Sequence, residues 1–380
     1  MKSHKTKASF LLIPMLVLII FGIIMIGSAD GWVYDPRSFD IDPLMIRQFV
    51  GLLIGLVLIF LIQHCSYDVL KLLAVPLFLG SVILLVVVLF FGTGAEEGDG
   101  VRRWLGVSTG ISVQPSEIAK VAQILLFATL FDRLQDKMDR FWLIALLAFL
   151  ALISLFLIYR EPDLSTTLVL FTVTLACFFA AGVSGWYILI VVLLILIGGF
   201  IIYQDALSST PHLLNPYQVE RILAWLSPED YALTTAYQTV QSRMAIGSGG
   251  LFGKGLFQNS GLVPIAATDF IFGIIGEELG LAGCLSIILL YLWICIRILW
   301  IGAHSEDLFG KIICSGVAIM IGFQAVVHMG VTTALLPNTG LPLPFVSYGL
   351  SSLIANMVGI GLVLRINIEN YTLRNRGYFL

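Results

Sequence analysis

Between Leu164 and Gln204 the chain carries no charged residue. This run is too long for a single membrane crossing, which takes about 20 residues as an α-helix. Other uncharged apolar runs recur along the 380-residue chain. Because 58% of the residues are hydrophobic and only 12% are charged, we expect an all-α polytopic membrane protein rather than a soluble domain.

Ten transmembrane helices account for these runs. The long run divides into two helices at 180–185, where the sequence reads AAGVSG. The first run exceeds a signal-peptide core in length and lacks a small-x-small cleavage site, so we expect it to be retained. We expect the whole chain, 1–380, to form a single membrane domain. The remaining eight spans are expected at 10–26, 45–63, 71–92, 117–133, 141–159, 270–302, 310–336 and 350–366.

The distribution of basic residues predicts the orientation. The N-terminus is basic, one short connection holds Arg133, Lys137 and Arg140, and the tail carries Arg374 and Arg376. Basic connections stay on the cytoplasmic side, so both termini are expected there. The outer segments are then 93–116, 204–268 and 337–349.

Several cations remain on the outer side against this rule, and an anionic ligand would explain them. They are Arg102, Arg103, Arg221, Arg243 and Lys254. The five cysteines and five histidines lack metal-ligand spacing, so we expect buried apolar cysteines and no metal site. No nucleic-acid-binding motif is present.

The outer segment 204–268 holds two features. In NPYQVERILAWLSPEDY, apolar residues at helical spacing predict a helix that lies in the membrane interface and ends before Pro228. The glycine-rich QSRMAIGSGGLFGKG does not match a phosphate-binding P-loop. Ser248 stands where that motif has its first glycine, and Gly255 stands where it has serine or threonine after the lysine. Two interpretations stay open: a flexible re-entrant turn, or a backbone that approaches a phosphate closely.

Two further features concern the outer half of the bundle. Glu117 and Lys120 lie at i, i+3 on one helix face, so they form either a structural ion pair or one wall of a wet cavity. The segment 337–349 contains three prolines and two glycines. Irregular backbone at membrane depth requires protein or a cavity beside it, which predicts a structured cap.

Three carboxylates lie in or beside one apolar run: Asp269, Glu277 and Glu278. On a continuous helix, Glu277 would lie roughly 12 Å deeper than Asp269, and Glu278 would point to nearly the opposite side. A retaining glycosidase needs two carboxyl groups about 5 Å apart, so these residues do not form such a pair. We expect the deeper two to hold helices or cavity charges, and Gly276 and Gly280 to permit close helix packing.

Four motifs, in order and spacing, resemble the SEDS family of bacterial cell-wall polymerases, which includes RodA, FtsW and SpoVE. They are QPSEIAK, SRMAIGSGGLFGKG, TDFIFGIIGEELG and LPNTGLPLPFVSYG. The resemblance covers nearly the whole chain, and the AIGSGGLFGKG motif and the short termini are more similar to the RodA branch than to FtsW. It implies ten membrane helices in the bacterial plasma membrane and the polymerisation of lipid II at the outer face. It also implies a class B penicillin-binding protein as partner.

The resemblance places the family's essential aspartate at Asp269, within Thr268-Asp269-Phe270. We expect Asp269 to act as general base on the acceptor 4-hydroxyl, with inversion at the donor anomeric carbon. Partial desolvation should raise its pKa above the ordinary value of about 3.9. The pyrophosphate leaving group needs cations and no strong protein acid. The expected substrate-binding residues are Arg102, Arg103, Glu117, Lys120, Arg243, Lys254 and Ser347.

The sequence departs from the family pattern at several positions: Ile265, Ala267, His328, Leu350 and Glu161. Ile265 replaces an acidic residue near Asp269, which bears on substrate positioning and on assistance by a divalent cation, the one cofactor left open. Glu161 replaces the glutamine of the family's Gln-Pro-Asp-Leu.

Two alternatives from other functional classes remain. A lipid II flippase would also need charges around an outward cavity, although it should carry matched gates on both faces. A non-catalytic scaffold for the penicillin-binding protein would need only its membrane helices.

Overall fold

The computed structural model describes residues 2–31, 41–94, 102–107, 111–135, 141–208 and 216–377. Helices dominate this part of the chain. In order they are α1 (Lys2–Ala29), α2 (Pro43–His64), α3 (Tyr67–Phe91), α4 (Pro115–Leu134), α5 (Phe141–Arg160), α6 (Leu164–Ala180), α7 (Gly185–Ala206), α8 (Pro216–Leu226), α9 (Tyr237–Ser248), α10 (Ile271–Ala303), α11 (Leu308–Thr332) and α12 (Leu350–Gly377).

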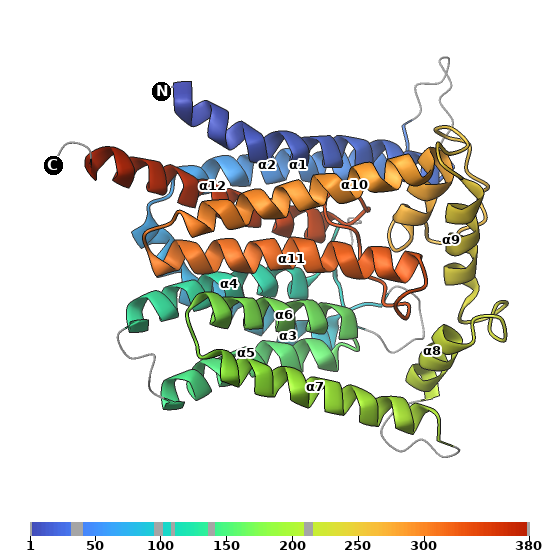
Figure 1. The fold of residues 1–380 in the computed structure, drawn as a ribbon, viewed down its shortest axis with the longest axis horizontal. Helices are drawn as coiled ribbons and strands as arrows, with labels where there is room; N and C mark the ends of the chain where they lie inside the picture. The colour runs from blue at the N-terminus through green and yellow to red at the C-terminus, as the bar shows by residue number, and fades with distance from the viewer. Residues whose placement is uncertain are drawn as a thin grey trace.

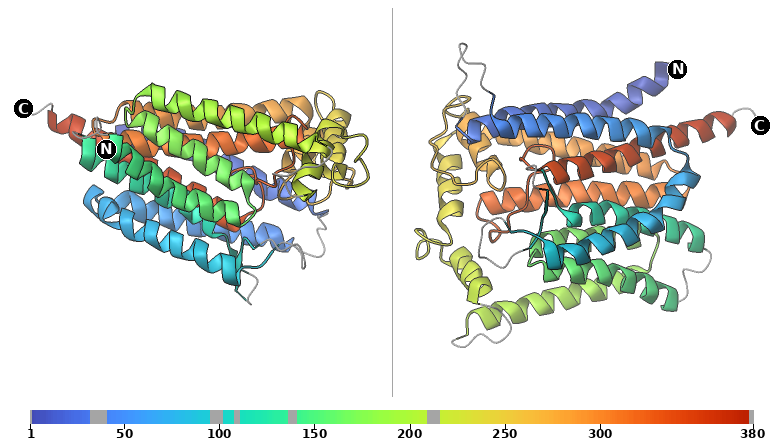
Figure 2. Two further views of the ribbon diagram at one scale, coloured as in Figure 1. Left: turned by 90° about the horizontal axis from the view of Figure 1, so that it is seen from below. Right: turned by 180° about the vertical axis from the view of Figure 1, so that it is seen from behind.

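The long helices run side by side in one bundle (Figure 1). Both termini lie at the same end of the bundle, and α8 and α9 lie across the opposite end in every view (Figures 1 and 2). The two termini thus lie at one end of the bundle, as the prediction of both on one side requires, and the side of the membrane that they face stays a prediction. We call the end with α8 and α9 the distal end.

Eight helices in the described part of the chain are long and apolar enough to cross a bilayer. They are α1 (from Phe10), α2, α3, α5, α7, α10, α11 and α12. Of the expected ten, α4 and α6 are missing from this set. Helix α4 carries Glu117, Lys120, Asp132 and Arg133, and α6 is an apolar helix of 17 residues.

The centre of the bundle is formed by α11, which packs against α10, α6 and α4. Nearly all of its residues from Phe309 to Thr332 are buried or half-buried. Helix α7 lies at the edge and contacts little besides α6 and α8. Apart from Ala206 at its end, its described side chains are exposed or half-exposed, as expected of a helix that faces lipid.

Helix α10 is broken near its first third. Gly280 has φ 64° and ψ −160°, which no α-helix contains. The condition of a continuous helix from Asp269, on which the expected depth and direction of Glu277 and Glu278 depend, is not met: the helix begins at Ile271 and kinks at Gly280. Glycine is required there because its conformation lies in the positive-φ region that residues with a Cβ avoid.

The glycine-rich segment 249–255 supplies the hydrogen bonds that the kink leaves open. The Leu281 amide donates to the Gly250 carbonyl at 2.9 Å. The amides of Lys254 and Gly255 donate to the carbonyls of Glu277 and Glu278, at 3.0 and 2.9 Å. An exchange of this kind lets irregular backbone persist inside a membrane protein. The prediction of close packing at Gly276 and Gly280 is confirmed, with this segment and α9 as the partners.

Two smaller elements complete the distal end. Helix α8 occupies the segment where a helix was predicted and ends at Leu226, before Pro228. A hairpin of β1 (Leu105–Val107) and β2 (Ile111–Val113), antiparallel, precedes α4. The sequence did not suggest this hairpin, so the fold is mostly rather than entirely helical.

Candidate active site

Asp269 lies in a turn at the distal end, immediately before α10. The amides of Thr268 and Asp269 both donate to the carbonyl of Ile265, at 3.3 Å. Ile265 has φ 50°, an uncommon value for a β-branched residue. The turn holds the Asp269 side chain half-buried at the mouth of the bundle.

The irregular segment 337–349 packs over the distal end and is held by side chains from several helices. The carbonyls of Leu341 and Pro342 bond His328 and Gln324 of α11, at 2.7 and 2.9 Å. Further bonds reach this segment's carbonyls from Arg221 of α8, Ser165 of α6, Tyr291 of α10 and Gln48 of α2. The predicted structured cap is therefore confirmed.

This cap also fixes the turn that carries Asp269. The Ser347 hydroxyl donates to the Thr268 carbonyl at 2.6 Å, and the Tyr348 amide donates to the Ala267 carbonyl at 2.9 Å. Gly340 faces the carboxyl group itself, because a Cβ atom at that position would lie 3.3 Å from Asp269 Oδ2. Ser347, which we expected to bind substrate, is 4% exposed and is engaged by this turn; its role towards substrate stays a prediction.

Two arginines act on the Asp269 carboxyl group. Burial raises the pKa of Asp269 above its ordinary value, and the Asp163 carboxylate adds to that rise. A hydrogen bond from Thr268 and the charges of Arg103 and Arg221 oppose it. The prediction that desolvation raises this pKa is confirmed. A carboxylate with a raised pKa is a stronger base, yet the arginines keep anionic charge favourable beside it.

Arg221 had no assigned role in the sequence-based site. Its guanidinium donates to the Asn338 carbonyl at 3.1 Å, which brings α8 against the cap. The sequence signal was present, since Arg221 is one of the outer cations that oppose the charge rule. Its proximity to Asp269 depends on how α8 folds back over the bundle, which periodicity does not reveal.

The other outer cations lie in different surroundings. Arg102 donates to the Leu89 and Phe90 carbonyls, at 3.2 and 3.0 Å, and so caps the last turn of α3. Arg243 is exposed on α9. Neither acts on Asp269 as Arg103 and Arg221 do, and their proposed contacts with substrate stay predictions.

The predicted pair of Glu117 and Lys120 forms at 2.9 Å, with both side chains almost fully buried. The Lys120 ammonium also donates to Gln324 Oε1 at 3.0 Å, and the Gln324 amide nitrogen donates to the cap at Pro342. An ion pair in this position links α4, α11 and the cap. The sequence left two interpretations open, a structural ion pair or one wall of a wet cavity. These contacts are those of a structural ion pair, and a contact of Glu117 or Lys120 with substrate stays a prediction.

The two deeper carboxylates fasten the glycine-rich segment to α10. Glu277 pairs with Lys254 at 2.6 Å and accepts from the Ser260 amide at 3.1 Å. Glu278 accepts from the Asn259 side chain at 2.7 Å and from the Ser28 hydroxyl of α1. The prediction that these glutamates hold structure is confirmed. Lys254, a proposed substrate ligand, therefore already has an anionic partner.

The turn between α5 and α6 adds two carboxyl groups that were not assigned to the site. Asp163 caps α6 by accepting from the Thr166 amide at 3.0 Å. Glu161 is fully buried, and neither carboxyl oxygen has a hydrogen-bond partner among the described residues. Burial, and then the Asp163 charge, raise the pKa of Glu161 to about 8, while the Arg103 charge opposes that rise.

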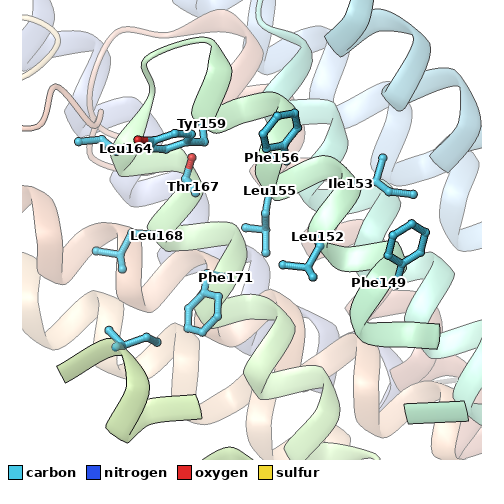
Figure 3. Close-up of a pocket in the computed structure, with 11 residues that line it drawn as sticks. Phe149, Leu152, Ile153, Leu155, Phe156, Tyr159, Leu164, Thr167, Leu168 and Phe171 are labelled. Atoms are coloured by element: carbon cyan, nitrogen blue, oxygen red, sulfur yellow. The ribbon is translucent and has the colours of Figure 1, made fainter. Parts of the chain in front are cut away.

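An apolar groove of about 730 Å³ lies between α5, α6 and α7. Figure 3 shows Tyr159, Leu164 and Thr167 at the end of the groove next to the α5–α6 turn. Leu152, Leu168 and Phe171 lie further along it. The groove runs towards the turn that contains Glu161 and Asp163.

Within the described residues, no three His, Cys, Asp or Glu side chains are grouped as ligands for a metal ion. The five cysteines are free, and all are buried or half-buried. Assistance by a divalent cation stays a prediction.

The family model described as "Cell cycle protein", for FtsW, RodA and SpoVE, matches residues 8–372. The chain belongs to the SEDS family. It is 34% identical to the "Probable peptidoglycan glycosyltransferase FtsW" of Geobacter sp. (strain M18), over 94% of this chain and 95% of that protein. It is 35% identical to "Stage V sporulation protein E" of Bacillus subtilis, over 98% of this chain and all of that protein.

Two solved structures share the fold. One, described as "Structural coordination of polymerization and crosslinking by a peptidoglycan synthase complex", matches with a TM-score of 0.78 and 32% identity, over 95% of this chain and 97% of that one. The rod shape determining protein RodA of Thermus thermophilus matches with a TM-score of 0.67 and 31% identity, over 96% and 97%. Because FtsW, SpoVE and RodA all match at similar identity, the preference for the RodA branch stays a prediction.

Proposed function

We propose that this SEDS chain is a peptidoglycan glycosyltransferase that polymerises lipid II, with Asp269 as its general base. The observation that carries the proposal is the half-buried Asp269 carboxyl at the distal end, with a raised pKa and the charges of Arg103 and Arg221 acting on it. The curated names of the FtsW relatives support the same activity.

The reaction is a direct displacement. The 4-hydroxyl oxygen of the acceptor sugar attacks the donor anomeric carbon, and its proton passes to Asp269. The bond from that carbon to the lipid pyrophosphate breaks, and the electron pair leaves with the pyrophosphate. A single displacement inverts the anomeric carbon. General-base catalysis of this kind contributes about 10²–10⁴-fold to the rate.

Arg103 and Arg221 are the best-placed cations for the charge that develops on the pyrophosphate. Fixed positive groups that stabilise a developing anion usually make the largest single contribution to catalysis. Contacts of the substrate with Arg102, Glu117, Lys120, Arg243, Lys254 and Ser347 belong to the same proposal, although several of these residues have protein partners already.

We assign the apolar groove between α5, α6 and α7 to the polyprenyl chain of the lipid-linked substrate. Its lining is hydrocarbon over most of its length, and one end lies by the α5–α6 turn, where Arg103 bonds the backbone. A lipid chain in the groove would place its pyrophosphate near that arginine. The peripheral position of α7 gives such a chain a route in from the bilayer.

The proposed topology is a single membrane domain with ten crossings, in which α4 and α6 join the eight apolar spans. The charges on α4 are compatible with a crossing because Glu117 and Lys120 neutralise each other in the interior. The distal end, with α8 in the membrane interface, would face outward from a bacterial plasma membrane, and both termini would be cytoplasmic.

The proposed partner is a class B penicillin-binding protein that crosslinks the new glycan strands. Support comes from the match to a protein solved within a peptidoglycan synthase complex that coordinates polymerization and crosslinking. The remaining partners are lipid II and the bilayer; we propose no role in nucleic-acid binding.

The test is glycan polymerisation by the purified protein with lipid II, alone and with its penicillin-binding protein. We expect polymer from wild type and a loss of about 10²-fold or more for Asp269→Asn, which keeps the shape and removes the base. An Asp269→Asn protein that polymerises at the wild-type rate would show that the base lies elsewhere. If wild type makes no polymer with its partner, a vesicle assay for lipid II translocation separates a flippase from a non-catalytic scaffold.

A further inference from the structure

Glu161 is a buried acidic residue with no cation paired to its carboxyl group among the described residues. It lies between α5 and α6, its side chain is 0% exposed, and both carboxyl oxygens lack partners among the described residues. An unpaired buried carboxylate is so unfavourable that the group takes up a proton instead. The geometry alone therefore favours the neutral acid.

Arg103 is next to this carboxyl group but is bonded to the backbone. Its Nε donates to the Glu161 carbonyl at 3.4 Å, and its Nη2 donates to the Pro162 carbonyl. The arginine thus reaches the α5–α6 turn without forming an ion pair with Glu161. Its positive charge is left for other anions nearby.

Asp269 is one of these anions. The charges of Arg103 and Asp163 act on both Asp269 and Glu161, so the three carboxyl groups share one electrostatic neighbourhood. The charged groups that face Glu161 are Arg103 from the 102–107 segment and Asp163 at the start of α6. Arg221 of α8 also acts on Asp269.

We propose that Glu161 is a positioning residue whose neutral carboxylic acid leaves the charge of Arg103 to Asp269 and to the substrate pyrophosphate. Loss of its proton to solvent adds a third negative charge beside a single arginine, so an ionised Glu161 weakens pyrophosphate binding. This inference rests on the proposed function. It concerns a position where the family pattern has glutamine, which is always neutral.

The proposal predicts a specific pH response. Since the pKa of Glu161 is raised to about 8, the neutral form dominates below that pH and is lost as the pH rises through it. We expect KM for lipid II to rise about fivefold between pH 7 and pH 9.5, the size of effect that one added negative charge has on a nearby anion when water screens the interaction strongly. The rate constant kcat should change less, since the proposed effect acts on the binding of the pyrophosphate.

The experiment compares KM and kcat from pH 6 to pH 9.5 for wild type, Glu161→Gln and Glu161→Asp in detergent micelles. The glutamine variant mimics the neutral acid, so its KM should change less than about twofold over this range. The aspartate variant keeps a titratable carboxyl group and should retain the rise. Glu229→Gln makes the same substitution at an exposed carboxylate after α8, away from the site, and should follow wild type.

A Glu161→Gln protein with the wild-type rise in KM would overturn the proposal, and so would Glu229→Gln removing it. An independent readout is infrared difference spectroscopy of the purified protein. Wild type should show a carboxylic acid band that disappears as the pH passes about 8, and Glu161→Gln should lack it. If no variant polymerises, lipid II binding in nanodiscs over the same pH range still measures the effect of Glu161, so the two proposals fail separately.

Discussion

Gly340 is the point at which the cap meets the carboxyl group of Asp269. It has φ +67°, and an added Cβ would lie 3.3 Å from Asp269 Oδ2. We expect Gly340→Ala to cost about 1–2 kcal/mol of stability from backbone strain alone. The methyl group should also displace the carboxyl group, and small displacements of a reacting group can cost up to about 100-fold in rate. Polymerisation assays should therefore show that kcat falls about tenfold or more, because the carboxyl group is displaced from the reacting position.

The matched control is Gly182→Ala, in the turn between α6 and α7. Gly182 has φ +80° and no atom within 4 Å of its added Cβ, so it carries the same backbone strain without a neighbour to displace. Its thermal midpoint should fall as much as that of Gly340→Ala while its kcat stays near wild type. Equal losses of kcat in both variants would mean that the Gly340–Asp269 contact does not matter for the reaction.

At the residue scale, the sequence could identify Asp269 but not its surroundings. Its motif is local, whereas the arginines that act on it come from residues 103 and 221. Arg102 and Arg103 are adjacent, yet one caps α3 and the other reaches the α5–α6 turn. Which of two neighbouring side chains points to the site depends on the path of the backbone, and a charge pattern does not contain that path.

At the scale of elements, most helices follow from the sequence and the exceptions share one cause. The apolar runs and the break at 180–185 are local signals, so the boundaries of α6 and α7 could be predicted. The kink at Gly280 could not, because its hydrogen bonds come from residues 250–255. Helix α9 and the β1–β2 hairpin have weak local patterns as well, and they form against elements that precede or follow them in the chain.

The hydrogen bonds between the glycine-rich segment 249–255 and α10 give a prediction at this scale. At Gly253 an added Cβ would lie 2.1 Å from the Glu278 carbonyl oxygen, and the residue has φ +79°. Gly253→Ala must push the segment away from α10 and uncover the hydrogen bonds at the kink. We expect a loss on the order of 3 kcal/mol or more, the range for disrupted buried networks. Thermal unfolding and limited proteolysis within 249–261 would measure it.

Gly250→Ala is the control for the Gly253→Ala variant. Gly250 has φ +57° and nothing within 4 Å of its added Cβ, so only backbone strain of about 1–2 kcal/mol is expected. Similar midpoints and cleavage rates for the two variants would contradict the view that contact with α10, rather than glycine content, holds this segment.

The groove between α5, α6 and α7 gives a second prediction for elements. Leu168→Trp should fill part of it and raise KM several-fold for lipid II with its full polyprenyl chain. The KM for an analogue with a short chain should stay within about twofold, since one hydrophobic contact changes binding modestly. Leu289→Trp, on a lipid-facing position of α10 that is 64% exposed, makes the same substitution away from the groove. If both tryptophan variants affect both substrates equally, the polyprenyl chain binds elsewhere.

Across the whole molecule, the start of α10 and the turn between α5 and α6 lie at the end of the bundle opposite the termini (Figure 1). Asp269, the cap and the α5–α6 turn all belong to that distal end. A flippase would need a comparable set of groups at the other end of its path. An enzyme that acts on a substrate presented at one membrane face needs them at that face alone. The ion pairs at the opposite end, Lys71–Asp132 and Arg365–Glu369, are satisfied within the protein, so the placement of the proposed site at one end fits polymerisation.

The ten-crossing topology predicts which connections are reachable from outside the cell. In variants that each add one cysteine to the native chain, Leu233→Cys at the 92% exposed position between α8 and α9 should react with an impermeant maleimide on intact cells. Gln135→Cys after α4, Ser184→Cys after α6 and Glu306→Cys after α10 should react only after permeabilisation. All three positions are exposed at the ends of their helices.

The native cysteines are buried or half-buried, so the unmodified chain provides the background. Labelling of Gln135→Cys on intact cells would mean that α4 does not cross, and labelling of Glu306→Cys but not Leu233→Cys would reverse the proposed orientation.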